Sequence, residues 1–187
     1  LIGRVVPIKD VKTFLRAMRT LVNEIPDAKG WIAGPEDEDK EYAAECRSLV
    51  TSLGLEKNVE FLGFQKIDEL LPKVGVVVLS SISEALPLVL LEGFAAGVPA
   101  VSTDVGSCRQ LIEGLDEDDR AFGTAGSVVG IADPEALGKA VANLLSNPQA
   151  WHEAQQAGIR RVETLYTQQQ MFGSYRELYQ GLLEGER

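Results

Sequence analysis

The sequence has few histidines and cysteines, residues that commonly take part in nucleophilic catalysis or bind transition metals. Its 187 residues include one histidine, His152, and two cysteines, Cys46 and Cys108. A single histidine excludes Ser/His/Asp and Cys/His catalysis unless that one imidazole lies at the site, and its polar helical surroundings favour a solvated surface position. The cysteines form no CxxC pattern, which predicts two reduced, buried thiols rather than a zinc site or a disulfide framework.

Basic residues are also scarce, and long apolar runs are absent. The chain has 18 Lys and Arg against 28 Asp and Glu, a formal net charge of -10. Such a chain is unsuited to non-specific nucleic-acid binding, so an anionic ligand requires a locally positive site. No apolar run approaches the roughly 20 residues that span a bilayer, and no secretory signal is recognisable. We expect a cytoplasmic protein and, because the chain opens on Leu1 inside an apolar run, the second half of a longer one.

Short apolar runs alternate with segments of helical period, the pattern of a parallel sheet buried between helices. Strands are predicted at residues 1–6, 30–33, 59–62, 76–79, 100–102 and 127–131. Helices are predicted at residues 11–25, 39–53, 67–71, 88–96, 107–113 and 134–145. The acidic run at residues 113–119, EGLDEDD, is interpreted as a solvated loop.

From residue 148 the strands stop and the pattern is helical. A final apolar stripe with helical spacing comprises Met171, Tyr175, Leu178, Tyr179 and Leu182. The sequence therefore predicts an α/β fold: a Rossmann-like parallel sheet flanked by helices over residues 1–147, followed by a helical C-terminal segment over residues 148–187. The final helix either packs on this domain or crosses to a neighbouring one.

Residues 80–101, SSISEALPLVLLEGFAAGVPAV, contain the most informative pattern. They begin where a predicted strand ends and become helical at Pro87. Proline at the first helical position has its φ already set, and the amides of Leu88 and Val89 then remain free donors at the positive end of the helix dipole. This arrangement predicts a diphosphate-binding site.

Charged side chains complete the predicted site. Glu84 precedes Pro87 and can face sugar hydroxyls, while Glu92 lies one helical turn after Leu88 and leans back toward the helix start, where it suits a ribose diol. Arg4 and Lys9 lie at the carboxyl end of the first predicted strand, the edge where open α/β sheets bind ligands. Each charge alone is more simply a surface residue, but their combination predicts a nucleoside diphosphate sugar neutralised by cations, without a metal.

The spacing of these residues resembles a known family. Glu84 and Glu92, separated by seven residues and followed by GFAAGVPAVSTDVGS, are similar to the signature of retaining glycosyltransferases of family four, which have the GT-B fold. GRVVPIKD resembles that family's Gly-Arg with a lysine five residues after the arginine. VEFLGFQKIDELLPKV and ADPEALGKAVANLL extend the likeness over nearly the whole chain. The resemblance implies the C-terminal, donor-binding half of a GT-B enzyme.

The resemblance also implies roles for individual residues. Catalytic roles fall on Glu84, Lys9 and Arg4. Diphosphate, ribose, sugar and base contacts fall on Arg4, Lys9, Phe64, Gln65, Glu84, Ala85, Leu86, Leu88, Val89 and Glu92. Two departures stand out: Leu86 and Pro87 replace a Phe-Gly common after the first glutamate, which removes one amide donor, and Gln110 replaces a common glutamate.

The implied donor is a UDP-sugar, with no metal cofactor. Similarity to members that make exopolysaccharides implies a polysaccharide acceptor and partners in an inner-membrane synthesis complex, to which the protein would be peripheral. The family's N-terminal domain, also a partner, is absent from these residues, so we expect them to be inactive alone. A sugar-nucleotide epimerase of similar fold and a non-catalytic nucleotide-sugar-binding domain remain alternatives. A nicotinamide oxidoreductase is disfavoured because no GxGxxG follows a strand.

Overall fold

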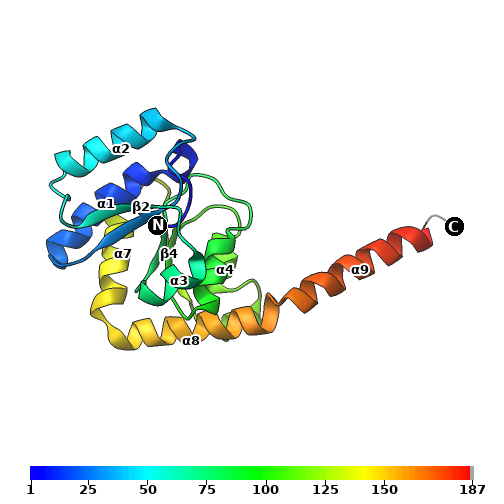
Figure 1. Cartoon of the computed structure of the whole chain (residues 1–187). Helices are drawn as coiled ribbons and strands as arrows, with labels where there is room; N and C mark the ends of the chain where they lie inside the picture. Colours follow the sequence, from blue (N-terminus) through cyan, green and yellow to red (C-terminus); the bar gives the residue numbers. More distant parts are fainter. Residues whose placement is uncertain (186–187) are drawn as a thin grey trace.

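Parallel strands form the centre of the fold (Figure 1). The computed structural model describes residues 1–185, and in that part of the chain five strands pair, all in parallel. The strands form two sheets, one of order β1-β2 and one of order β3-β4-β5. Their bounds are β1 Gly30–Ala33, β2 Val59–Gly63, β3 Val77–Leu79, β4 Ala100–Thr103 and β5 Gly126–Val129. These strands match the predicted ones to within two residues at each end.

The predicted first strand, residues 1–6, is wrong. A single bridge pairs Ile2 with Ala33, and the chain then leaves the sheet. The amide of Gly3 donates to the Ala33 carbonyl at 2.9 Å, but the amide of Val5 reaches Pro35, beyond the end of β1. Pro35 has no amide hydrogen with which to continue a ladder. The chain instead forms the 3-10 turn η1 (Pro7–Lys9) and enters α1.

Helices cover both faces of the sheets, because each strand alternates between two cores. On one side, Val78 and Val101 share a core with α1 (Val11–Glu24), α2 (Lys40–Ser52) and α7 (Pro134–Ser146). On the other side, Val77, Leu79 and Ala100 pack with α4 and α5. The bounds on that side are α4 Leu88–Ala95 and α5 Cys108–Glu113, and α8, Pro148–Leu165, packs across α4. Two short helices, α3 Ile67–Leu70 and α6 Glu117–Arg120, and the 3-10 turn η2 Leu71–Lys73 complete the domain.

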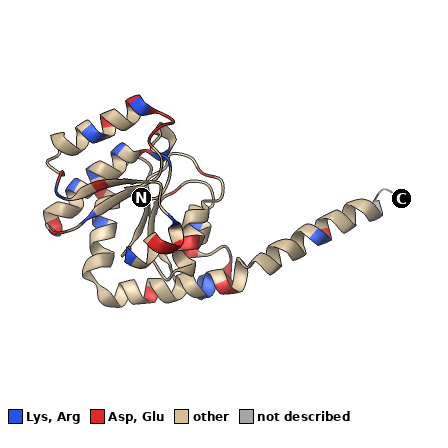
Figure 2. Cartoon of the chain, in the orientation of Figure 1, with Lys and Arg blue, Asp and Glu red and all other residues tan. Residues whose placement is uncertain are grey.

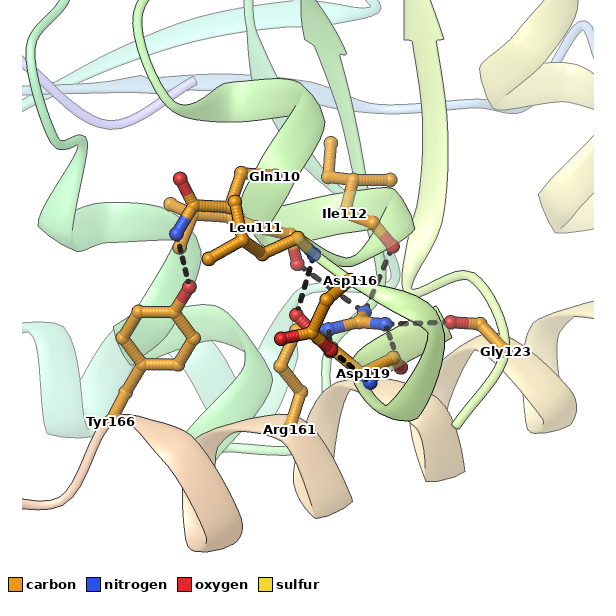
Figure 3. A network of polar contacts seen from close by, with 9 residues as sticks. Gln110, Leu111, Ile112, Asp116, Asp119, Gly123, Arg161 and Tyr166 are labelled. Atoms are coloured by element: carbon orange, nitrogen blue, oxygen red, sulfur yellow. Dashed lines mark hydrogen bonds and ion pairs between the residues drawn. The ribbon is translucent and has the colours of Figure 1, made fainter. Parts of the chain in front are cut away.

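The acidic run at residues 113–119 was predicted as a solvated loop, and this is only partly right: residues 115–118 are exposed, but the run contains a helical turn and a buried acid. Asp116 caps the short helix α6, and the Asp119 side chain is buried. Asp119 accepts from Arg161 of α8 at 2.5 Å, and Arg161 itself has no exposed surface. The same guanidinium donates to the carbonyl oxygens of Ile112 and Gly123 at 2.9 and 2.8 Å (Figure 3). A buried ion pair therefore holds α8 against the segment between α5 and β5.

The C-terminal helices extend the fold beyond the sheets. The predicted helical run is interrupted at Tyr166, whose hydroxyl accepts from Gln110 at 3.0 Å (Figure 3). Thr167 and Gln170 then form a reciprocal cap, and α9 (Gln168–Gly185) projects away from the domain (Figure 1). Every residue of the predicted final stripe is exposed. Residues 186–187 of the predicted segment lie outside the described residues, and the domain division at residue 147 stays a prediction.

The structure also shows whether any described helix could span a membrane, and where the histidine and the two cysteines lie. None of the helices described within residues 1–185 combines the length and apolarity needed to cross a membrane. His152 is exposed on α8. Cys46 and Cys108 are fully buried, and burial raises the pKa of the Cys46 thiol to about 11. Both thiols are therefore poor nucleophiles at neutral pH.

Candidate functional site

An ion pair joins two loops at the carboxyl edge of the sheets. Lys9 ends η1, Glu84 lies between β3 and α4, and the Lys9 Nζ is 2.6 Å from the Glu84 Oε1 although the residues are 75 apart in sequence. The side chains are only 24% and 13% exposed, so the pair is partly shielded from solvent. The Ser81 hydroxyl donates to the same carboxylate oxygen at 2.7 Å. The structure thus brings together two residues that the sequence placed at one site.

Buried serine hydroxyls fix the positions of both loops. The Ser80 Oγ donates to the carbonyl oxygens of Lys9 and Asp10 at 2.9 and 3.0 Å, and the amide of Ile82 donates to Ile8. These bonds hold the backbone of Lys9 against the end of β3. Sequence reasoning missed Ser80 and Ser81, although two consecutive serines directly after an apolar strand are a detectable signal.

The loop after β4 supports the glutamate from the other side. The Thr103 hydroxyl donates to the Ser81 carbonyl at 2.7 Å, and the amide and hydroxyl of Ser107 both donate to the Ala85 carbonyl, at 3.0 and 2.9 Å. Gly106 makes this contact possible, because a Cβ there would collide with the carbonyl oxygens of Glu84 and Ala85. Glu84 is therefore held by the ends of two neighbouring strands.

Replacing Gly106 by alanine is expected to lower the free energy of unfolding by about 1 to 3 kcal/mol, because its φ of 51° is unfavourable for other residues and because of the collision. Urea denaturation measures the change. Gly54→Ala is the matched control: Gly54 has a φ of 65° but nothing within 4 Å of an added Cβ. Equal losses in the two variants would show that the close approach to Glu84 does not matter.

The start of α4 differs from the prediction by one residue. Pro87 is the N-cap rather than the first helical residue, because its ψ of 98° is extended. The helix begins at Leu88, so the amides of Leu88 and Val89 lie in the first turn, where no intrahelical acceptor exists. Within residues 1–185 neither amide bonds to another element, and the exposed Glu92 carboxylate has no partner. These donors remain available to an anion.

The other predicted side chains, those of Arg4, Phe64 and Gln65, form no hydrogen bond with the Lys9–Glu84 pair within residues 1–185. The Arg4 Nη1 donates to both carboxylate oxygens of Glu38, at 2.6 and 2.7 Å. Phe64 follows β2 with 81% of its surface exposed, and the Gln65 amide donates to the Leu62 carbonyl.

An apolar groove of about 670 Å³ borders the site. Its walls are the start of α4, with Leu86, Leu88 and Leu91, and the first turns of α9, with Met171 and Tyr175. Leu86 and Leu88 are about half exposed. No group of three His, Cys, Asp or Glu side chains suited to a metal ion occurs in the described part of the chain. The site therefore offers positive charge, helix amides, carboxylates and an adjoining apolar surface.

Residues 1–161 match the model of the family described as glycosyl transferases group 1. An exopolysaccharide phosphotransferase of Streptomyces coelicolor is 36% identical over 77% of this chain and 14% of its own length. A D-inositol 3-phosphate glycosyltransferase of Corynebacterium urealyticum is 30% identical over 78% of this chain and 34% of its own length. The crystal structure of Anabaena HepE in complex with UDP and glucose superposes with a TM-score of 0.78 at 20% identity, over 94% of this chain and 48% of that one. The chain thus spans about half or less of the length of these proteins, and the structural likeness confirms the α/β, Rossmann-like GT-B fold.

Proposed function

Because the chain belongs to the glycosyl transferases group 1 family, we propose that it binds a UDP-sugar as the donor-binding half of a retaining glycosyltransferase. The observation that carries the proposal is the partly buried Lys9–Glu84 pair, held beside the first turn of α4 by the ends of β3 and β4. A cation and unbonded helix amides suit a diphosphate, and a fixed carboxylate suits sugar hydroxyls. The HepE complex, with UDP and glucose on a similar fold, also supports it.

The proposed reaction transfers a hexose with retention of the anomeric configuration. Lys9, Arg4 and the positive end of the α4 dipole stabilise the negative charge that develops on the departing UDP. Glu84 accepts hydrogen bonds from the donor sugar, and Glu92 accepts them from the ribose hydroxyls. Ala85, Leu86, Leu88 and Val89 offer backbone groups to the sugar and phosphates, and Phe64 and Gln65 lie toward the base. The cations neutralise the diphosphate, so no metal takes part.

The proposed acceptor is a growing polysaccharide, in a role like that of PelF, the cytoplasmic glycosyltransferase of Pel exopolysaccharide synthesis. Two observations support this role: the similarity of the sequence to family members that make exopolysaccharides, and a relative named as an exopolysaccharide phosphotransferase. In this proposal the protein works in the cytoplasm and reaches the inner membrane through partners of the synthesis complex.

Activity also requires the N-terminal GT-B domain, which we propose contacts α9 and the adjoining groove. The exposed apolar residues of α9 and the 670 Å³ groove support such a contact. The comparison with HepE also supports it, because this chain covers only 48% of the HepE chain. These 187 residues should therefore bind donor without turning it over.

Calorimetric titration of this chain with UDP, UDP-glucose, ADP and NADH tests the proposal. We expect UDP and UDP-glucose to bind at one site per chain, and NADH to show no heat of binding. Failure of UDP to bind would refute the donor-binding function. A second experiment, on the full-length enzyme, distinguishes the alternatives. A transferase releases UDP only when an acceptor is present. An epimerase converts the sugar without releasing UDP, and a non-catalytic domain does neither.

A further inference from the structure

Glu38 holds the guanidinium that the proposed function assigns to the diphosphate. Both Glu38 carboxylate oxygens lie within hydrogen-bond distance of the Arg4 Nη1, at 2.6 and 2.7 Å. The donor phosphates and the Glu38 carboxylate are both oxyanions. Glu38 takes the N–H groups of Nη1 and offsets the charge of the guanidinium, which leaves fewer donors and less positive charge for a phosphate. The guanidinium cannot give its full charge to both at once.

The backbone brings Glu38 to this position. Glu38 lies in the loop between β1 and α2, which has the sequence GPEDED. The acidic residues of this loop are red in Figure 2, where the chain enters α2. The Val5 amide donates to Pro35 at 2.9 Å, and Gly34 lies so close to Gly3 that any Cβ at position 34 would overlap the Gly3 backbone. The start of the loop is therefore tied to the residues on both sides of Arg4.

Other acids of the same loop have different partners. Glu36 forms a two-bond ion pair with Arg47 of α2, and Asp39 caps α2 through the amide of Tyr42 at 2.9 Å. Glu38 is the loop residue that reaches across to Arg4. The side chains of this pair are 53% and 51% exposed, so the pair is weak enough for a bound phosphate to displace it.

We infer that Glu38 is a competing anion that lowers the affinity of the site for the donor diphosphate until the phosphates displace it from Arg4. This inference rests on the proposed UDP-sugar function and adds a residue that sets donor affinity. In the donor-free protein, Glu38 neutralises Arg4. On binding, the guanidinium turns to the phosphates, and the carboxylate moves into solvent.

Titration of UDP into Glu38→Gln and Glu36→Gln chains tests the inference. Each variant removes one negative charge from the same loop, but only the first frees Arg4. We expect Glu38→Gln to bind UDP about two- to fivefold more tightly, the range for an exposed ion pair, and Glu36→Gln to match the unchanged chain. The increase in UDP affinity of the Glu38→Gln chain should be smaller at high salt, because salt weakens the competition of Glu38 for Arg4 in the unchanged chain.

A second comparison separates competition for Arg4 from a general effect of charge. In an Arg4→Ala background, Glu38→Gln should no longer change the UDP affinity. Equal affinities of the two glutamine variants, or a gain that persists without Arg4, would overturn the inference while leaving UDP binding intact. If the unchanged chain does not bind UDP, the proposed function fails, and the inference fails with it.

Discussion

Replacing Arg161 by methionine is expected to lower the free energy of unfolding by about 3 to 5 kcal/mol, the cost of leaving one member of a buried ion pair without its partner. Arg161 and Asp119 are 0% and 2% exposed, so solvent cannot replace the lost bonds. The guanidinium also donates to the carbonyl oxygens of Leu111, Ile112, Asp119 and Gly123. Urea denaturation followed by circular dichroism measures the loss.

Arg160→Met is the matched control, because Arg160 is the neighbouring residue on α8 and is exposed. It should change the free energy of unfolding by less than about 0.5 kcal/mol. If Arg161→Met does not fold, Asp119→Asn provides the test, because it removes the charge but keeps an oxygen that accepts from Arg161. An Arg161→Met variant as stable as Arg160→Met would contradict a structural role for the buried pair.

The apolar pattern predicted most of the fold, because burial determines it. Strands β1 to β5 read as short apolar runs, and the stripe that begins at Val11 places α1 correctly. The failure at residues 1–6 has a different origin. Those residues are as apolar as a strand, and Val5 and Val6 are buried, but their hydrogen-bond partners depend on where β1 ends. Apolarity predicts burial, and it does not distinguish a strand from a buried turn.

Arg161 shows how residue type can conceal a periodic signal. The buried residues of α8 are Ala154, Ala157, Gly158 and Arg161, at the spacing of one helical face. The period alone therefore placed Arg161 in the interior, but a charged residue is normally interpreted as exposed. Its partner Asp119 had no such signal, because α6 is a single turn within an acidic run. The cap that separates α9 from α8 was missed, although Thr167 and Gln170 have the spacing of a capping box.

The candidate site was predictable where strand ends define it. Glu84 follows β3. Lys9 follows residues 1–6, which were predicted as a strand but pair with the sheet only at Ile2, and the two side chains still meet. The partner of Arg4 could not be predicted in this way. The loop between β1 and α2 has four acidic residues, at 36–39, and which of them meets Arg4 depends on the loop geometry that the Val5–Pro35 hydrogen bond helps to fix. Hydrogen bonds from Ser80 and Ser107 to the backbone likewise depend on tertiary structure.

Lys9→Ala is expected to weaken UDP binding about ten- to a hundredfold, equivalent to about 1.5 to 3 kcal/mol for one lost charge-assisted contact. Two effects act in the same direction. The ammonium is lost from the phosphates, and the Glu84 carboxylate repels them, because it keeps only the hydrogen bond from the Ser81 hydroxyl and its negative charge is no longer neutralised. An ammonium has three donors, so in the unchanged chain Lys9 can bond to Glu84 and to a phosphate oxygen at once. Isothermal titration calorimetry at constant ionic strength measures the dissociation constant.

Lys12→Ala is the control with the same change of charge. Lys12 lies three residues further along and pairs with Glu45 at 2.5 Å, on the outer side of α1 and α2. Its replacement should leave UDP affinity within about twofold, because its ammonium is paired with Glu45 and not with Glu84, and because an exposed charge is screened by salt. Lys9→Arg should recover part of the loss, since the charge returns with a different reach. If Lys9→Ala and Lys12→Ala bind UDP equally well, then the Lys9–Glu84 pair serves the fold alone, and the diphosphate lies elsewhere.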